Sequence, residues 1–196
     1  ATPSALHASH TIQALDRGLA VYCQKPLGRN YRETLQVIVA AHKVDRLLMV
    51  DFCYRYVAGM QKIRERLQQG AIGEVYAVDL VFHNAYGPDK DWFYDVTRSG
   101  GGCVIDLGIH LVDLVFWALE ENSPKAVESR LFAQGKRIEG EIDLVEDYAA
   151  ACIDLQSGAT VNLTCSWNLP AGQDAVIEAS FYGAEGGLSL KNVNGS

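Results

Sequence analysis

The pattern of apolar and polar residues in the first fifty positions alternates between helix and strand. Residues 4–17 and 31–44 repeat apolar positions at helical spacing, whereas the shorter apolar runs at 19–23 and 47–52 have the length of strands. Helix and strand in alternation predict a parallel α/β sheet covered on both faces. Ligands of such sheets bind at the carboxyl ends of the strands.

From residue 70 onward the pattern changes to strands. Strand length, β-branched or aromatic residues and flanking turn residues predict strands at 74–84, 126–134, 148–155, 160–167 and 176–182. A helix is predicted just before them, and an apolar helix around 106–117 interrupts them. This second part is therefore predicted to be α+β, with the helix on one face of a large, mostly antiparallel open sheet. The predicted domains are residues 1–54 and 55–196.

The apolar helix carries three polar residues, Asp106, His110 and Asp113. At spacings of four and three they share one face of an α-helix, and a helix apolar on its other faces is usually buried. Buried polar groups must be paired or functional. A carboxylate beside His110 would fix its tautomer and raise its basicity, as a general base requires, but a hydrogen-bonded core histidine explains the pattern equally well. No further ligands stand nearby, so no metal site is predicted.

Other candidates flank these elements. Lys25 follows a predicted buried strand, and Pro26 restricts it to extended backbone, so its ammonium is held at the edge of the sheet. Trp92 and Arg98 are candidates for lining a polar pocket, although an aromatic loop packed on the helix is an alternative. The glycines at 100–102 would let backbone approach a substrate or phosphate, or would simply form a flexible turn before the helix.

Composition narrows the class of partner. The net charge of -7 and scattered basic residues argue against nucleic acids and anionic membranes, which favours small molecules. No apolar run approaches the roughly 20 residues that span a bilayer, and no signal-like start is present, so a soluble cytoplasmic protein is expected. The five cysteines stand singly, without Cys-x-x-Cys, which fits a reducing compartment and buried structural thiols.

Several motifs together resemble the Gfo/Idh/MocA oxidoreductase family, which includes glucose-fructose oxidoreductase and inositol dehydrogenase. In family order along the chain they are Thr2-Pro3 followed by His7, then Tyr22-Cys23-Gln24-Lys25-Pro26-Leu27, then Gly-Gly-Gly-x-x-x-Asp106-x-Gly108-x-His110-x-x-Asp113. The resemblance implies a Rossmann-type nucleotide-binding domain followed by a domain built on a large open sheet. It also implies a homo-oligomer through the open sheet face.

The resemblance implies an NAD- or NADP-dependent dehydrogenase of a sugar, sugar acid or cyclic polyol. In it His110 accepts the hydroxyl proton, Asp106 orients the substrate or His110, and Lys25 stabilises the developing oxyanion, while Asp113 is a structural partner of His110. The cofactor residues implied are Thr2, Pro3, His7, Gln24, Lys25 and Pro26. The substrate residues expected are Lys25, Trp92, Arg98, Asp106 and His110.

Two departures from the family pattern stand out. Gln24 replaces the motif's usual Glu, which removes a charge but keeps a hydrogen-bonding group. The glycine fingerprint of the first βαβ unit is absent, so the chain is expected to be truncated at its start and also at its end. Two alternatives remain: a non-catalytic sugar or dinucleotide sensor, and an NAD-retaining hydrolase or lyase of the same fold.

Overall fold

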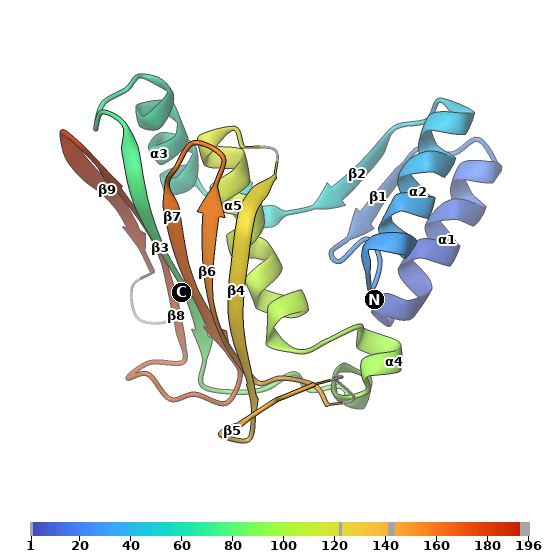
Figure 1. Ribbon diagram of the computed structural model, residues 1–196. Helices are drawn as coiled ribbons and strands as arrows, with labels where there is room; N and C mark the ends of the chain where they lie inside the picture. The colour runs from blue at the N-terminus through green and yellow to red at the C-terminus, as the bar shows by residue number, and fades with distance from the viewer. Residues whose placement is uncertain (1, 122, 141–143, 193–196) are drawn as a thin grey trace.

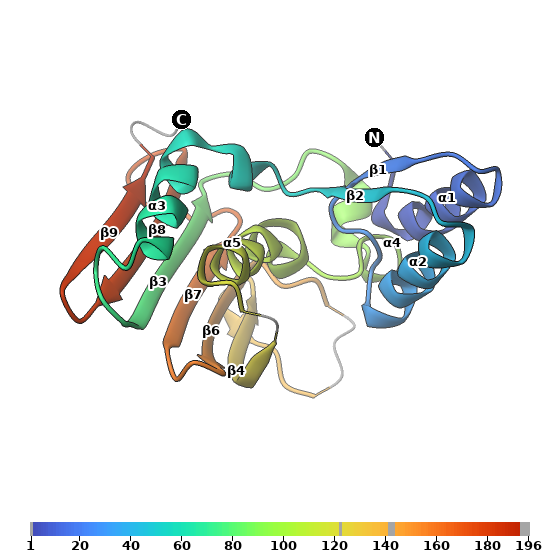
Figure 2. The same cartoon turned by 90° about the horizontal axis from the view of Figure 1, so that it is seen from above.

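The computed structural model describes residues 2–121, 123–140 and 144–192. The chain forms two parts that lie side by side (Figure 1), a small N-terminal part up to residue 51 and a larger C-terminal part. A single extended connector leads from one to the other across the top of the molecule (Figure 2). The two parts correspond to the α/β and α+β segments predicted from the sequence.

The N-terminal part is two helices on a parallel pair of strands. Its elements are α1 (Ser4–Asp16), β1 (Val21–Gln24), α2 (Tyr31–Val44) and β2 (Leu48–Asp51). The strands pair from Val21 with Leu48 to Gln24 with Asp51, in parallel as predicted. Leu15 and Val37 are fully buried between the helices and the strands. Asn30 caps α2 by accepting from the Glu33 amide, which explains why this helix begins where the sequence predicts.

The connector continues into the C-terminal part through a short 3₁₀ turn, η1 (Cys53–Tyr56), and α3 (Ala58–Gln68). Seven strands follow: β3 (Val75–Asn84), β4 (Pro124–Ala133), β5 (Lys136–Arg137), β6 (Tyr148–Leu155), β7 (Thr160–Ser166), β8 (Ala175–Gly183) and β9 (Gly186–Lys191). They form one sheet in the order β5-β4-β6-β7-β3-β8-β9. Only the pair β3 and β7 is parallel within the described sheet, so the prediction of a mostly antiparallel sheet is confirmed.

Two strands were missed. β5 has two residues, too few for any pattern. β9 starts with Gly186 and Gly187 and carries few β-branched residues, so its sequence resembles a turn, and only its pairing with β8 makes it a strand.

The apolar helix is more complex than predicted. The segment between β3 and β4 contains η2 (Asp91–Tyr94), α4 (Val96–Ser99), a five-residue π-helical turn η3 (Val104–Gly108) and α5 (Ile109–Leu119). The π turn bonds residue i to i+5, so side chains four apart across it do not align as in an α-helix. Together α3 and α5 cover one face of the sheet (Figure 1) and bury its core, which includes Leu111, Val115, Val161 and Phe181.

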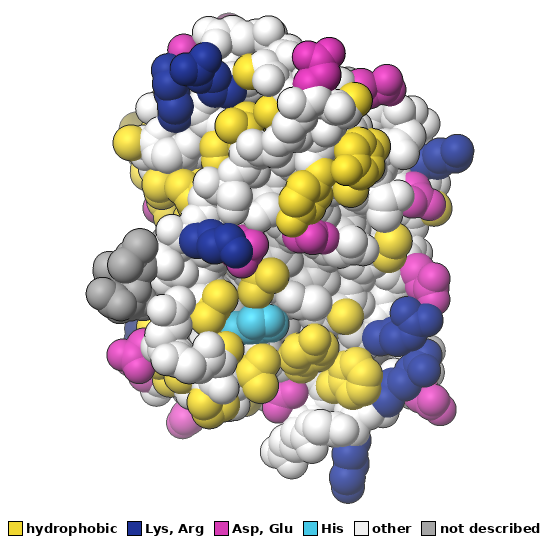
Figure 3. All heavy atoms as spheres, turned by 90° about the vertical axis from the view of Figure 1, so that its left-hand side faces the viewer, with side chains coloured by type: hydrophobic (Ala, Val, Ile, Leu, Met, Phe, Trp, Pro, Cys, Tyr) yellow, Lys and Arg dark blue, Asp and Glu magenta, His cyan; other side chains and the backbone are white. Residues whose placement is uncertain are grey.

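The opposite face of the sheet carries no helix among the described residues (Figures 1 and 2). Figure 3 shows hydrophobic side chains grouped around a histidine, with acidic and basic side chains between and beside them. The register places Val81, His83, Thr164 and Tyr148 on this face, because their neighbours Leu80, Phe82, Cys165 and Ala149 point into the core.

One helical stretch, Val96–Leu119, is long and apolar enough to cross a membrane by length and composition alone. The sequence analysis found no such run because Asp106, His110 and Asp113 interrupt it. Half of the apolar window is buried inside the fold, and the core helix of a globular protein passes the same test.

The glycines before η3 serve close backbone contact rather than a ligand. The carboxylate of buried Glu146 accepts from the amides of Gly102 and Val104, and its carbonyl accepts from Cys103. A carboxylate that occupies these amides leaves no donors for a phosphate, so that alternative is not supported. A Cβ on Gly102 would lie 1.9 Å from the Glu146 carbonyl oxygen, which requires glycine there.

We therefore expect Gly102→Ala to lower the free energy of unfolding by about 3 kcal/mol, the upper range for overpacking in a rigid site. Gly186→Ala is the matched control, because a Cβ there would lie at an ordinary 3.6 Å from its nearest neighbour, Cγ2 of Ile72. Urea denaturation of both variants measures the difference. Equal stability of the two variants would contradict the proposed backbone contact.

Candidate active site

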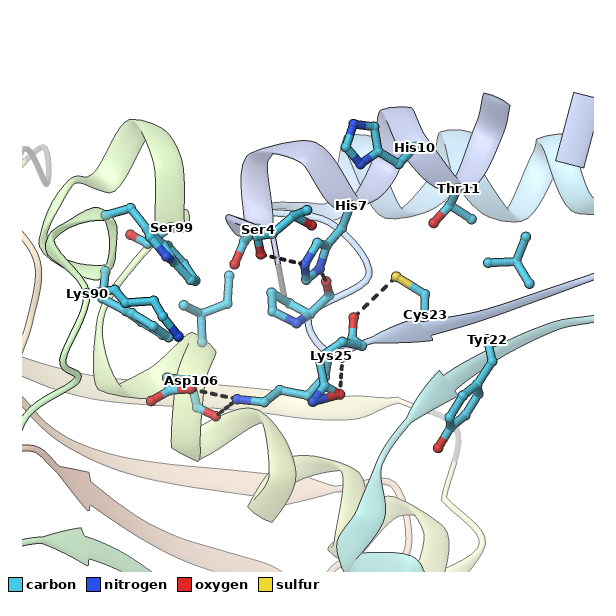
Figure 4. A pocket seen from close by; sticks show the side chains of 17 residues that line it. Ser4, His7, His10, Thr11, Tyr22, Cys23, Lys25, Lys90, Ser99 and Asp106 are labelled. Atoms are coloured by element: carbon cyan, nitrogen blue, oxygen red, sulfur yellow. Dashed lines mark hydrogen bonds and ion pairs between the residues drawn. The ribbon is translucent and has the colours of Figure 1, made fainter. Parts of the chain in front are cut away.

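A cavity of about 530 Å³ lies between the two parts. One wall comes from α1 and β1, and the other from the loop around Lys90, from Ser99 and from η3 (Figure 4). The cavity therefore sits at the carboxyl end of β1, where the sequence predicts a ligand site. Of the predicted site residues, those that line it are Thr2, His7, Gln24, Lys25, Pro26, Trp92 and Asp106.

An ion pair between Lys25 and Asp106 closes the cavity on one side. Lys25 Nζ lies 2.6 Å from Asp106 Oδ1 and 2.5 Å from the Asp106 carbonyl oxygen, and Figure 4 shows the lysine extended toward it. The two side chains are only 13% and 19% exposed. Two residues 81 positions apart, singled out separately from the sequence, are thus brought together by the fold.

Asp106 has a second partner that the sequence analysis missed. Trp167, at the end of β7, donates its indole N–H to Asp106 Oδ2 at 3.1 Å. Trp167 is 3% exposed, and the sequence predicts it only as the last residue of a strand. No local signal identifies this role, because the contact joins residues 61 positions apart. With Lys25 on one oxygen and Trp167 on the other, the carboxylate is fixed in orientation.

His110 is enclosed by aromatic rings rather than carboxylates. It is 6% exposed, with Tyr54 edge-on at 4.9 Å and Phe52 at 6.3 Å between ring centroids. Its Nδ1 is buried and has no hydrogen-bond partner among the described residues. Burial, followed by the charge of Lys25, lowers the pKa of His110 to about 4, although Asp106 and Asp51 oppose the shift. His110 is therefore neutral at pH 7.

Two expectations about His110 are wrong. Asp113 is not its partner: its carboxylate is held by Arg55, with Nε 2.7 Å from Oδ2 and Nη2 on Oδ1. Nor is its basicity raised overall: Asp106 and Asp51 raise the pKa of His110, but burial and the charge of Lys25 outweigh them. The physical reasons are the π turn, which changes the phase between Asp106 and His110, and η1, which brings Arg55 to α5 from outside the helix.

The remaining predicted residues take different places. Both ring nitrogens of buried His7 face backbone carbonyls, Nδ1 that of Pro26 at 2.7 Å and Nε2 that of Thr2 at 3.1 Å, so the ring ties α1 to the end of β1. Pro3 is the N-cap of α1 and is not among the lining residues. Arg98 and His110, both predicted to contact substrate, also lie outside the lining, Arg98 because it is exposed elsewhere and His110 because it is buried beneath aromatic rings.

Among the five cysteines, Cys23 lines the cavity. Cys103 and Cys165 are fully buried with sulfurs 3.8 Å apart, and their contact and burial raise the pKa of Cys103. Cys23 is buried as expected, whereas Cys53 and Cys152 are exposed. Across residues 2–121, 123–140 and 144–192, no three His, Cys, Asp or Glu side chains gather to hold a metal ion.

Comparison with known sequences places this geometry in a family. The profile described as "Oxidoreductase family, NAD-binding Rossmann fold" matches residues 1–52, and the "GFO/IDH/MocA C-terminal domain" matches residues 60–189. The chain belongs to the Gfo/Idh/MocA family. The resemblance seen in the sequence motifs is thereby confirmed, and so is the fold class that it implied.

Named relatives include D-glucoside 3-dehydrogenase of Escherichia coli (strain K12), 29% identical over 96% of this chain and 57% of that enzyme. Inositol 2-dehydrogenase 3 of Saccharopolyspora erythraea is 27% identical over 94% of this chain and 51% of its own length. The chain thus spans about half the length of the curated relatives it matches.

Solved structures agree. GenD2 from gentamicin A biosynthesis, in complex with NAD, is 28% identical with a TM-score of 0.86, covering 97% of this chain and 53% of that one. Levoglucosan dehydrogenase in complex with NADH and L-sorbose is 25% identical with a TM-score of 0.85, covering 97% and 52%.

Burial of neutral His110 predicts a pH-dependent stability. Its folded pKa of about 4 lies below the ordinary 6.5, so the unfolded chain binds the proton more readily and stability falls as pH drops from 6.5 toward 4. Between pH 7 and pH 5 this histidine should remove roughly 2 kcal/mol of unfolding free energy. Urea denaturation at both pH values checks this, with His110→Gln as the comparison. The loss should be smaller in that variant by the same amount, and an identical loss in both proteins would disprove it.

Proposed function

We propose that the protein is an NAD(P)-dependent oxidoreductase acting on a hydroxyl of a sugar, sugar acid or cyclic polyol, with His110 as the proton acceptor. The observation that carries the proposal is a fixed cation, Lys25, paired with Asp106 at a cavity, close enough to buried His110 for its charge to lower the pKa of that histidine. A positioned cation and a neutral imidazole are what removal of a hydroxyl proton requires.

The cavity residues fit the nicotinamide and ribose end of a dinucleotide. Thr2, Ser4, His10 and Thr11 offer hydroxyl and imidazole groups along α1, beside Gln24 at the end of β1. Gln24 keeps its amide nitrogen for a ligand, because its Oε1 accepts from the Lys25 amide at 3.2 Å. NAD(P)+, when bound, supplies the hydride acceptor. Pro3 and His7 would act indirectly, by holding the start of α1 against Pro26.

The roles of the site residues follow from their contacts. Lys25 would place its ammonium near the reacting oxygen and stabilise the developing negative charge, while Asp106 keeps that ammonium in place. His110 would take the proton at a ring nitrogen, and its Nδ1 has no hydrogen-bond partner among the described residues. Trp92 lines the cavity and stacks on Phe93 at 3.8 Å, so it offers an apolar wall to the face of a ring-shaped substrate.

The relatives support the substrate class. They are named as dehydrogenases of a D-glucoside and of inositol, and 1,5-anhydro-D-fructose reductase of Ensifer adhaerens, 28% identical over 98% of this chain, is a further example. We infer from the same comparisons that residues 1–54 and 55–196 are the cofactor and substrate domains, because the two profile matches end and begin on either side of η1.

Replacing the two proposed groups tests the proposal in the complete gene product. We expect Lys25→Met and His110→Ala to lower the rate of NAD(P)H formation from a polyol by about 10²- to 10⁴-fold, because each removes a group acting on the transferred proton or the oxyanion. Absorbance at the nicotinamide band measures it. Lys62→Met, in an exposed ion pair with Glu65, is the control and should retain full activity.

Unchanged rates in both variants would overturn the proposed mechanism. Quenching of NAD(P)H fluorescence without hydride transfer to any polyol would identify a sensor instead. Product release without net NAD(P)H formation would identify a hydrolase or lyase that retains its cofactor.

We also infer that the open sheet face joins a second copy of the chain. Val81, Tyr148 and Phe132 leave partly apolar surface on a sheet that no helix covers on that side in the described chain (Figure 3), and such faces are usually buried by association.

Val81→Arg places a charge in the middle of that face, so we expect it to convert the oligomer to monomer in sedimentation velocity. Leu6→Arg, on exposed α1 in the other part, is the matched control and should sediment as the wild type. A wild-type protein that sediments as a monomer would refute the interface.

A further inference from the structure

Asp113 lies on α5, and the proposed reaction does not use it. Its side chain is only 9% exposed, and its carboxylate accepts hydrogen bonds from Nε and Nη2 of Arg55. Such two-pronged pairs fix geometry as well as charge. Arg55 belongs to η1, the turn that joins the two parts of the chain, so the pair fastens the connector onto α5.

Arg55 also contacts Phe52, the aromatic residue directly before this turn. Its guanidinium carbon lies 5.4 Å from the centre of the Phe52 ring, within cation–π range. Phe52 and Tyr54 in turn stand edge-on to His110, with interplanar angles of 87° and 68°. A continuous set of contacts therefore runs from Asp113 through Arg55 to the Phe52 ring and on to His110, while Tyr54 is the residue next to Arg55 in the same turn.

We propose that Arg55 and Asp113 are positioning residues, which keep Phe52 and Tyr54 closed over His110 and thereby hold the proton acceptor dry and neutral. The groups whose charges act on His110 are Lys25, which lowers its pKa, and Asp106 and Asp51, which raise it. Neither Arg55 nor Asp113 is among them. Their influence is therefore through the cover of rings, and loosening the cover would let water reach the imidazole.

Two variants distinguish an effect of charge from an effect of the aromatic cover, because the two explanations predict opposite shifts of the His110 pKa in Asp113→Asn. If Arg55 and Asp113 acted on His110 through charge, Arg55→Gln would raise the pKa of His110 and Asp113→Asn would lower it. If they act through the cover, either variant opens it, and both raise the pKa of His110 from about 4 toward 6.5.

The experiment is an NMR titration of the histidine ring signals, with the His110 signal assigned by its absence in His110→Gln. We expect the His110 titration to move upward by one pH unit or more in both Arg55→Gln and Asp113→Asn. Arg64→Gln is the matched control: Arg64, on α3, pairs with Glu120 at 3.0 Å and lies 4.7 Å from the centre of the Trp117 ring, so its contacts are at the far end of α5 from His110. It should leave the titration unchanged.

Movement in opposite directions, or no movement in folded variants, overturns the proposal. If a neutral variant fails to fold, Arg55→Lys replaces it, because lysine keeps the positive charge but cannot form the bidentate contact with Asp113. His110 should still titrate higher in it, and an unchanged titration would again contradict the proposal.

The catalytic meaning of the pair rests on the proposed function, but the titration requires no turnover. If His110→Ala retains full activity while the titration moves as expected, the proposed reaction fails and the positioning role stands. If His110→Ala is inactive and the titration does not move, the proposed reaction stands and the positioning role fails.

Discussion

The contact between Lys25 and Asp106 is the constraint on which the site depends. Both side chains are largely withdrawn from water, and breaking a buried ion pair by removing one partner typically costs about 3–5 kcal/mol, because the other charge is left uncompensated. The pair joins the end of β1 to the π turn η3, so each part of the chain needs the other to complete its polar groups. The pair places charged groups at the cavity. After burial, the charge of Lys25 has the largest effect on the pKa of His110.

The π turn decides how the three polar residues of the apolar helix are used. A regular α-helix would stack Asp106 beneath His110 and lead to a carboxylate–histidine pair. The extra residue in the turn instead lets Asp106 face Lys25 and Trp167, while His110 faces the rings of the connector. Glu146 stabilises the start of this turn by accepting from two of its amides. The Asp106 carboxylate and the neutral His110 imidazole therefore have separate environments, although they are four residues apart.

Local patterns predicted the elements and long-range contacts decided the roles. The limits of α2 and β6 agree with the sequence because capping and apolar periodicity are local properties, whereas β9 depends on its partner strand. Lys25, Asp106 and His110 were found because each is an anomaly in an apolar stretch. Arg55 and Trp167 have no such signal: each acts on a residue about sixty positions away, so the spacing rule assigned Asp113 to His110 when its real partner lies outside the helix.

The proposal that His110 is the proton acceptor rests on which acceptor sites are already occupied. Both oxygens of Asp106 accept hydrogen bonds, from Lys25 and Trp167, and both oxygens of Asp113 accept from Arg55. Nδ1 of His110 has no donor among the described residues and carries no charge at pH 7. A substrate hydroxyl that reaches the imidazole would give a buried ring nitrogen the hydrogen-bond partner that it otherwise lacks, so the same side chain would serve binding and proton acceptance.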